Sequence, residues 1–229
     1  KILSIQENPQ TTKIYDRHGV LLYQIYANQN RTFVSLSSIP QQLRAATIAI
    51  EDNDFYSNPG FNIGAILRAA IADLSGKPLQ GGSTITQQLI KSTLLTPEVS
   101  ITRKIKEVIL AFWAERIYTK DQILQMYLNQ VPYGGTSYGA EAASQTYFGK
   151  HAKDLDLAQS AFLAGLPNAQ TYYSPYGEYP NIWKKRQKEV LLKMVEQKFI
   201  TKRQAEDGTK EELTFQPIQN SIRAPHFVM

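Results

Sequence analysis

Helical periodicity over residues 40–199 is the feature that most constrains the fold of this chain. Apolar side chains recur there at spacings of three and four residues, which is the pattern of amphipathic α-helices. The clearest stripe comprises Ile105, Val108, Ile109, Phe112 and Trp113. The chain has 229 residues, of which 42% are apolar, and this suits one or two domains with a buried core. We therefore expect a mainly α-helical protein.

Start and stop signals divide this region into separate helices. We expect helices at about residues 41–51, 62–74, from 84 onward, 101–118, 120–129 and 181–199, and in the segments YGAEAASQTYF and DLDLAQSAFLAGLP. Thr84 with Gln87, and Thr119 with Gln122, have the spacing of capping boxes. Residues 12–26 have the composition of a β-hairpin, and the segments ELTFQPI and APHFVM are strand-like.

Composition excludes several kinds of site. The absence of cysteine excludes disulfides, a thiolate nucleophile and a cysteine-based zinc site. His18, His151 and His226 are too far apart in the sequence to form a local metal motif. The net charge of +5 permits an anionic membrane, a phosphorylated substrate or nucleic acid, and selects none of them. No run of 18 apolar residues is present, so no segment is expected to span a bilayer.

The segment QGGSTITQQLIK, residues 80–91, has the composition of an anion site at a helix start. The free N–H groups and the positive dipole end of such a helix favour a phosphate. Thr84, Gln88 and Lys91 follow the spacing i, i+4, i+7, so they are expected on one face. An ordinary capped helix with a solvated polar face is the commoner outcome of this pattern taken alone.

Glu51 and Asp52 are expected at the end of an apolar helix, before an irregular segment. Partial burial of a carboxylate there would raise its pKa and suit it to general acid–base chemistry. A solvated helix end is the alternative. Because the macrodipole disfavours acids at a helix C-terminus, two adjacent acids call for compensating contacts.

The segment TRKIKEVIL carries a second charged cluster. Arg103 and Glu107 are spaced i, i+4, and Lys104 and Lys106 extend a cationic row that suits an anion. The alternative is a surface salt bridge worth less than about 1 kcal/mol. Farther along, Lys185 and Arg186 are expected on an exposed helix face.

Five segments, taken in order, resemble the consecutive motifs of the peptidoglycan glycosyltransferases, glycosyltransferase family 51. They are EDNDFYSNPG, GGSTITQQ, RKIKE, KDQILQMYLN and KRQKEVL. The resemblance runs from about residue 12 to residue 229 and includes YGAEAASQTYFGK, LAQSAFLAGLPNA and YSPY. It implies a mainly α, lysozyme-like fold with a head lobe and a membrane-proximal jaw lobe around residues 89–102. The terminal hairpin is expected to pair with the C-terminal strand-like segment.

The resemblance also implies an activity. The family polymerises lipid II into β-1,4-linked glycan, with inversion at MurNAc C1 and release of undecaprenyl pyrophosphate. Glu51 matches the general base that deprotonates the GlcNAc 4-hydroxyl of the acceptor. Glu107 matches the second essential carboxylate, near the donor pyrophosphate, and is the candidate ligand of a divalent cation, Mg²⁺ or Mn²⁺; no organic cofactor is expected. The implied substrate-binding residues are Asp52, Phe55, Gly82, Ser83, Thr84, Gln87, Gln88, Lys91, Arg103, Lys104, Lys120, Tyr127, Asn129 and Arg186.

Three positions depart from the family pattern. Asn58 stands where the first motif usually carries His, Ser92 where many relatives carry Asn, and Lys185 where an Arg pair is common. The usual His is not the base, so we expect activity to survive. The effect of Asn58 on the loop geometry and on the pH dependence of activity stays open. Lys185 cannot reproduce the bidentate geometry of Arg.

The family relationship carries expectations about domains, partners and location. Residues 1–35 are expected to form a hairpin and linker, 36–200 the glycosyltransferase domain, and 201–229 the start of a linker toward a transpeptidase domain. Expected partners are lipid II, the growing lipid-linked glycan, moenomycin-type inhibitors and that transpeptidase domain, and no nucleic-acid motif is present. We expect the domain on the outer, periplasmic or extracellular, face of a bacterial cell membrane, anchored by a transmembrane helix that precedes Lys1.

Two alternatives belong to other functional classes. A lysozyme-like hydrolase or lytic transglycosylase also uses carboxylates on a helical fold, but it does not need the cations at Lys91, Arg103 and Lys104. An inactive scaffold that binds lipid II or partner proteins gains slight support from Asn58. The presence of both Glu51 and Glu107 argues against it.

Overall fold

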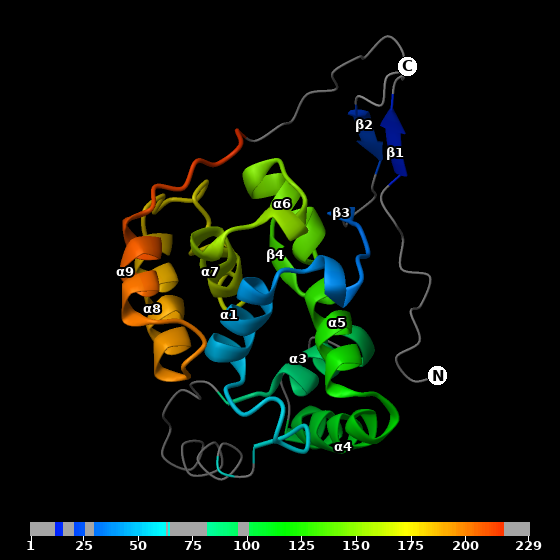
Figure 1. Ribbon diagram of the computed structural model, residues 1–229. Coiled ribbons are helices and arrows are strands. Elements are labelled where there is room, and N and C mark those ends of the chain that lie inside the picture. Colours follow the sequence, from blue (N-terminus) through cyan, green and yellow to red (C-terminus); the bar gives the residue numbers. More distant parts are fainter. Residues whose placement is uncertain are drawn as a thin grey trace.

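Helices make up most of the chain, as the periodicity predicts (Figure 1). The structure, a computed structural model, describes residues 12–15, 21–25, 30–62, 64, 82–95 and 101–217. Its α-helices are α1 (Gln41–Glu51), α3 (Ile85–Leu94), α4 (Ile101–Ile117), α5 (Lys120–Gln130), α6 (Ala140–Phe148), α7 (Leu157–Gly165), α8 (Trp183–Glu196) and α9 (Lys202–Lys210). The 3-10 helices are η1 (Leu36–Ser38) and η2 (Ala152–Asp154). The helix predicted at 62–74 lies outside the described residues, apart from positions 62 and 64.

The predicted N-terminal hairpin is confirmed, and a second sheet is new. Strands β1 (Thr12–Tyr15) and β2 (Leu21–Ile25) pair in antiparallel fashion. The second sheet has the order β3-β5-β4, with β3 (Asn30–Arg31) parallel to β5 (Ser137–Tyr138) and β4 (Pro132–Gly134) antiparallel to β5. Strands of two or three residues are too short to show a two-residue period, so the sequence did not reveal this sheet.

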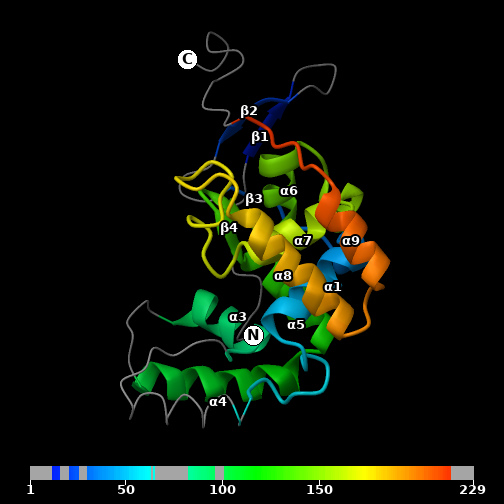
Figure 2. The ribbon, with the colours of Figure 1, turned by 90° about the vertical axis from the view of Figure 1, so that its left-hand side faces the viewer.

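Two groups of helices form the body of the molecule. Helices α1, α7 and α8 pack against one another, and α9 packs against α8 and α7. Helix α3 packs between α4 and α5. Figures 1 and 2 place α4 at one end of the molecule beneath α3, and the β1–β2 hairpin at the other end. The predicted division into a larger lobe and a smaller one is therefore present, and the smaller lobe extends through α4 beyond residue 102.

The C-terminal part differs from the prediction. Helix α9 begins with a capping box between Thr201 and Gln204, and it buries only Ala205 and Gly208. The segment has so few apolar residues that it shows no apolar stripe, which explains why the helix was not predicted. The strand predicted in ELTFQPI is wrong for residues 212–217, which form no strand. Instead, Phe215 packs in the aromatic core and the N–H of Gln216 donates to the carbonyl of Tyr147 at 2.9 Å.

The expected pairing of the hairpin with the C-terminal segment is absent over residues 211–217, and APHFVM lies outside the described residues. A search of the described helices finds none with the length and apolar content needed to cross a bilayer.

Candidate active site

Glu51 is the last residue of α1; its side chain is partly buried, and one of its carboxylate oxygens accepts a hydrogen bond. Oε2 accepts a hydrogen bond from Nε2 of Gln88 at 2.8 Å. Oε1 is buried and has no hydrogen-bond partner among the described residues. Burial raises the pKa of Glu51, while the Gln88 hydrogen bond and the positive charge of Arg186 oppose the rise. A desolvated carboxylate with an available oxygen has the properties of a general base.

Two tyrosines from other elements surround Glu51. The hydroxyl of Tyr127, on α5, donates to Oε1 of Gln88 at 3.1 Å. The hydroxyl of Tyr133, on β4, is buried without a partner in the described part of the chain. Burial raises the pKa of both phenols, and the negative charge of Glu51 raises it further. Tyr127 is buried in the core, but its polar end belongs to the Glu51 site. Tyr133 was not predicted as a site residue.

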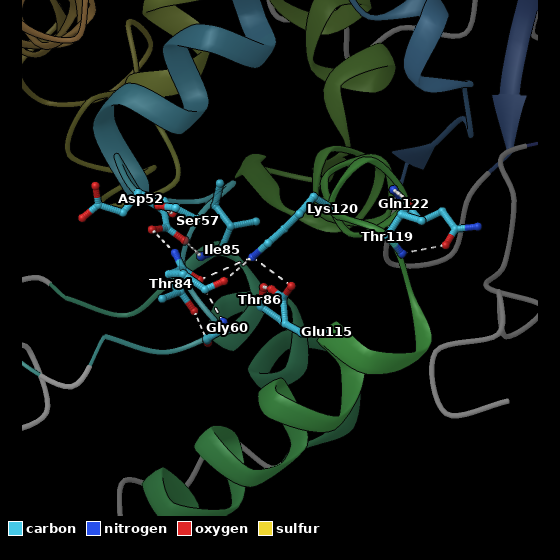
Figure 3. A network of polar contacts seen from close by, with 12 residues as sticks. Asp52, Ser57, Gly60, Thr84, Ile85, Thr86, Glu115, Thr119, Lys120 and Gln122 are labelled. Carbon is cyan, nitrogen blue, oxygen red and sulfur yellow. Dashed lines mark hydrogen bonds and ion pairs between the residues drawn. The ribbon is translucent and has the colours of Figure 1, made fainter.

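Asp52 directs its carboxylate to the start of α3. Oδ2 accepts from the backbone N–H of Ile85 at 3.0 Å, and Oδ1 accepts from Nδ2 of Asn58 at 2.8 Å. Burial raises the pKa of Asp52, and these hydrogen bonds together with the charge of Lys120 oppose the rise. Figure 3 shows Asp52 beside Ile85 at this helix end. The protein's own carboxylate therefore lies at the positive end of α3, where the sequence pattern suggested a phosphate.

The capping box between Thr84 and Gln87 is confirmed. Thr84 Oγ1 accepts from the N–H of Gln87 at 3.1 Å and donates to the carbonyl of Gly60 at 2.6 Å. Gln87 Oε1 accepts from the N–H of Thr84 at 3.1 Å. Both side chains are buried. The predicted common face is therefore divided: Thr84 contacts the loop after α1, Gln88 contacts Glu51, and Lys91 is exposed.

Lys120 holds the loop after α1 against the smaller lobe. Its Nζ lies 2.8 Å from Oε2 of Glu115 and donates to the carbonyl of Asn58 at 2.7 Å. The same ammonium lies 4.8 Å from the ring centroid of the buried Phe55. Figure 3 shows Lys120 reaching from α5 toward Glu115. Asn58 also accepts from the N–H of Gly60 at 2.8 Å, so the departure from the family pattern supplies an amide that bonds on both sides.

Asn129, like Lys120, holds backbone groups in place with its side chain. Its side chain accepts from the N–H of Val34 and donates to the carbonyl of Val34, both at 2.9 Å. It also donates to the carbonyl of Gln125 at 2.8 Å. Substrate contact by Phe55, Lys120 and Asn129 stays a prediction; in this structure they fix the backbone around the site.

A buried carboxylate between two cations forms the second part of the site. Glu107 on α4 is buried, with Oε1 3.1 Å from Nε of Arg103 and Oε2 2.9 Å from Nζ of Lys104. Lys104 also donates to Oγ of Ser83 at 2.8 Å. Ser83 and Gly82 precede α3, and Gly82 has the φ of 136° that favours glycine. Both parts of the site therefore meet the N-terminal end of α3: Gln88 bonds Glu51 and the Ser83 carbonyl, and the Ser83 hydroxyl bonds Lys104.

The described residues do not fit a resident metal ion at Glu107. Both of its oxygens contact cationic groups. Over the described ranges, no three His, Cys, Asp or Glu side chains gather closely enough to hold a metal. Because Mg²⁺ and Mn²⁺ require several oxygen ligands, this donor set does not favour them. The divalent cation stays a prediction, and no step is assigned to it here.

Arg186 is packed into the protein, so the expectation that it is exposed is wrong. Its Nε donates to the carbonyl of Gly165 at 3.3 Å, its Nη1 pairs with Glu189 at 2.9 Å, and its guanidinium lies 5.7 Å from the Tyr173 ring centroid. A Cβ on Gly165 would approach the Arg186 side chain to 2.8 Å. Glycine at position 165 thus permits this packing. Lys185 is exposed, as predicted.

Helix α4 has an exposed apolar stripe. Ile105, Ile109, Trp113 and Ile117 follow a four-residue spacing and are 51–55% exposed. Arg116 lies 4.1 Å from the Phe112 ring centroid, beside this stripe. The periodicity that predicted the helix therefore does not mark a wholly buried face. Figure 2 shows α4 at one end of the molecule.

A family model described as transglycosylase matches residues 18–195. The chain belongs to the transglycosylase family. The predicted enzyme class, peptidoglycan glycosyltransferase, is confirmed with it. This transglycosylase is 41% identical over 210 residues to Penicillin-binding protein 1A of Rickettsia bellii, covering 90% of this chain and 26% of that protein. It is 42% identical over 215 residues to Penicillin-binding protein 1A of Aquifex aeolicus, covering 93% and 29%.

The fold has a counterpart among solved structures. The crystal structure of Penicillin-Binding Protein 1A from Haemophilus influenzae matches 90% of this transglycosylase and 21% of that chain, with a TM-score of 0.52 and 25% identity. The predicted lysozyme-like helical fold is confirmed. A further relative, Penicillin-binding protein 2D of Bacillus subtilis, is 39% identical over 223 residues, covering 96% of this chain and 32% of that protein. The chain thus spans about a quarter to a third of these relatives' length.

Proposed function

We propose that this transglycosylase polymerises lipid II into β-1,4-linked glycan, with inversion at MurNAc C1 and release of undecaprenyl pyrophosphate. One observation carries the proposal: the N-terminal end of α3 links a carboxylate with one unpaired oxygen, Glu51, to a cationic cluster around Glu107, through Gln88 and Ser83. Inverting transfer from a diphosphate needs a base for the acceptor and positive charge for the leaving group. The residues around the start of α3 supply these two groups.

In the proposed reaction, the GlcNAc 4-hydroxyl oxygen of lipid II attacks C1 of the MurNAc at the reducing end of the growing chain. Glu51 accepts the hydroxyl proton as the new C1–O bond forms. The bond between C1 and the diphosphate oxygen breaks, and its electron pair leaves with the undecaprenyl pyrophosphate. Glu51 then releases the proton to solvent. The raised pKa of Glu51 supports this assignment, because a base is most effective when its pKa approaches the working pH.

The charge of the leaving group is met by side chains of α3 and α4 in this proposal. Lys104, with 41% of its side chain exposed, and the exposed Lys91 are accessible to a diphosphate. Glu107 holds Lys104 and Arg103 in place. The N-terminus of α3 contributes less to neutralising the leaving group, because Asp52 already accepts a hydrogen bond from the N–H of Ile85 there. Charge-assisted hydrogen bonds from ammonium and guanidinium groups are suited to phosphate oxygens.

Membrane association is part of the proposal. The exposed stripe Ile105, Ile109, Trp113 and Ile117 is bordered by the exposed cations Lys106 and Arg116. An apolar helix face with cations at its edge suits the surface of an anionic bilayer, where a lipid-linked substrate is found. In the full-length protein we propose an anchored domain at the outer face of a bacterial cell membrane, joined to a transpeptidase domain and inhibited by moenomycin-type compounds.

Incubation of the protein with labelled lipid II tests the proposed function. We expect long glycan strands together with released undecaprenyl pyrophosphate. A lysozyme-like hydrolase or lytic transglycosylase would instead release sugar fragments from preformed glycan without chain growth, and that result would contradict the proposal. An inactive scaffold would bind lipid II and form no product.

A further inference from the structure

We infer that Tyr127 and Gln88 form a positioning relay that holds the Glu51 carboxylate and leaves Oε1 as its proton-accepting oxygen. This inference rests on the proposed function and deepens it. The Tyr127 hydroxyl donates to Gln88 Oε1 at 3.1 Å, and Gln88 Nε2 donates to Glu51 Oε2 at 2.8 Å. The three side chains come from α5, α3 and α1, so the relay links three helices at the base.

The direction of the relay follows from the chemistry of its members. An ionised carboxylate only accepts hydrogen bonds, whereas a side-chain amide has one donor end and one acceptor end. Tyr127 keeps its proton because its burial and the nearby Glu51 charge raise the pKa of the phenol. A protonated phenol can donate to the amide oxygen, so the amide nitrogen faces Glu51. The opposite amide orientation would bring two oxygens together at Glu51.

The relay distinguishes the two oxygens of Glu51. Oε2 is occupied by Gln88, while Oε1 is buried and has no hydrogen-bond partner among the described residues. An unpaired buried acceptor is costly in a folded protein and calls for an explanation. A sugar hydroxyl that donates to Oε1 would supply the missing partner and place its proton on the base.

Other ionisable groups around Glu51 do not replace the relay. Arg186 on α8 lowers the pKa of Glu51 by its charge, but its nitrogens bond to Gly165 and Glu189. Asp52 raises that pKa slightly and bonds to the start of α3. The Tyr133 hydroxyl, on β4, has no hydrogen-bond partner in the described structure. Gln88 therefore makes the one side-chain hydrogen bond found for Glu51 in the described residues.

This assignment differs from direct substrate binding, which the sequence resemblance implied for Gln88 and Tyr127. Loss of a substrate contact raises KM, whereas displacement of a base lowers kcat and changes its ionisation. The Gln88 hydrogen bond lowers the pKa of Glu51. Weakening that bond raises the pKa, so the acidic limb of the rate profile moves to higher pH.

The test uses Tyr127→Phe and Gln88→Met in the full chain, with lipid II polymerisation measured across the pH range. We expect Tyr127→Phe to lower kcat by about 10-fold, with KM within about twofold of the wild-type value, and to move the acidic limb to higher pH. Gln88→Met should act in the same direction and more strongly. Since Tyr127 acts through Gln88, adding Tyr127→Phe to Gln88→Met should cause no further loss.

Tyr176→Phe is the matched control. It removes a tyrosine hydroxyl that donates to the carbonyl of Gln216 at 2.6 Å, and no contact with Glu51, Gln88 or Tyr133 is involved. We expect its acidic limb to coincide with that of the wild type.

Three results would overturn the relay: a raised KM for Tyr127→Phe with an unmoved acidic limb, additive losses in the double variant, or the same limb shift in Tyr176→Phe. Failure of the proposed function is separate. It would show as no lipid II polymerisation by the wild type, or as polymerisation by Glu51→Gln at the wild-type rate.

Discussion

Glu51 and Asp52 are neighbours in the chain, yet their carboxylates bind two different groups near the N-terminus of one helix, α3. Glu51 accepts from the side chain of Gln88, and Asp52 accepts from the backbone N–H of Ile85. Asp52 has φ −160° and ψ 81°, so the chain leaves the α-helical path between the two side chains. The compensating contacts that two acids at a helix C-terminus require are therefore present, and one of them is the positive end of α3.

Asp52→Ala should destabilise the protein. The substitution leaves the Ile85 N–H and the Asn58 amide without their buried acceptor, which costs about 1–3 kcal/mol. Urea denaturation measures the free energy of unfolding. Asp54→Ala, at an exposed position two residues away, is the control and should change it by less than about 0.5 kcal/mol. Equal losses in the two variants would contradict the role assigned to Asp52.

The contacts of Asp52 could not be predicted from the sequence, whereas the local contacts of the helix ends could. The bounds of α1 and the capping boxes at Thr84 and Thr119 could be predicted because the interacting residues are within four positions of each other. The Asp52–Ile85 bond joins residues 33 positions apart, and the helix-start pattern alone cannot say which anion occupies it. In this structure the carboxylate of Asp52 accepts from that N–H, and the pyrophosphate at this helix start stays a prediction.

Packing explains the other differences. Arg186 lies on a polar stretch of α8, but the missing side chain at Gly165 gives its stem a place against α7. Tyr133 belongs to a three-residue strand, and its position near Glu51 depends on how β4 meets α1. Neither arrangement leaves a local pattern in the sequence. Family resemblance correctly indicated the fold and the enzyme class, whereas contact partners required the structure.

Glu51→Gln should change how stability depends on pH. Burial raises the folded-state pKa of Glu51 above its unfolded value. The wild type therefore loses stability as pH rises from the unfolded pKa, about 4.3, toward the folded pKa, because only the unfolded chain ionises freely in that window. The variant lacks this loss. Its free energy of unfolding relative to wild type should increase with pH across the window, measured by denaturant titration at several pH values. An unchanged difference would contradict the assigned shift.

Lys104→Ala should impair transfer more than the loss of a neighbouring lysine. Lys104 bonds both Glu107 and Ser83, so its loss removes positive charge from the proposed donor site and loosens the link between α4 and α3. We expect kcat/KM on lipid II to fall by about 100-fold. Lys106→Ala removes the same charge from an exposed position on the same helix and should stay within about twofold. Similar losses in both variants would indicate a general charge effect instead.

The α4 stripe should mediate binding to anionic vesicles. Ile109→Glu with Trp113→Glu places two negative charges on a face that is about half exposed, 52% and 51% for these residues. We expect binding to phosphatidylglycerol vesicles to weaken by at least about 10-fold, with an unchanged free energy of unfolding. Leu192→Glu, at another exposed apolar residue (51%) on α8, is the control. A loss of binding for Leu192→Glu equal to that of the double variant would contradict the assignment.

The most direct test of the account is polymerisation of labelled lipid II by Glu51→Gln, with lipid II binding measured on the same sample. The substitution keeps the size of the side chain and an oxygen for Gln88, but it removes the basic oxygen of the carboxylate. We predict that binding largely survives and that no glycan strands form. Polymerisation by Glu51→Gln at the wild-type rate would show that Glu51 is not the base.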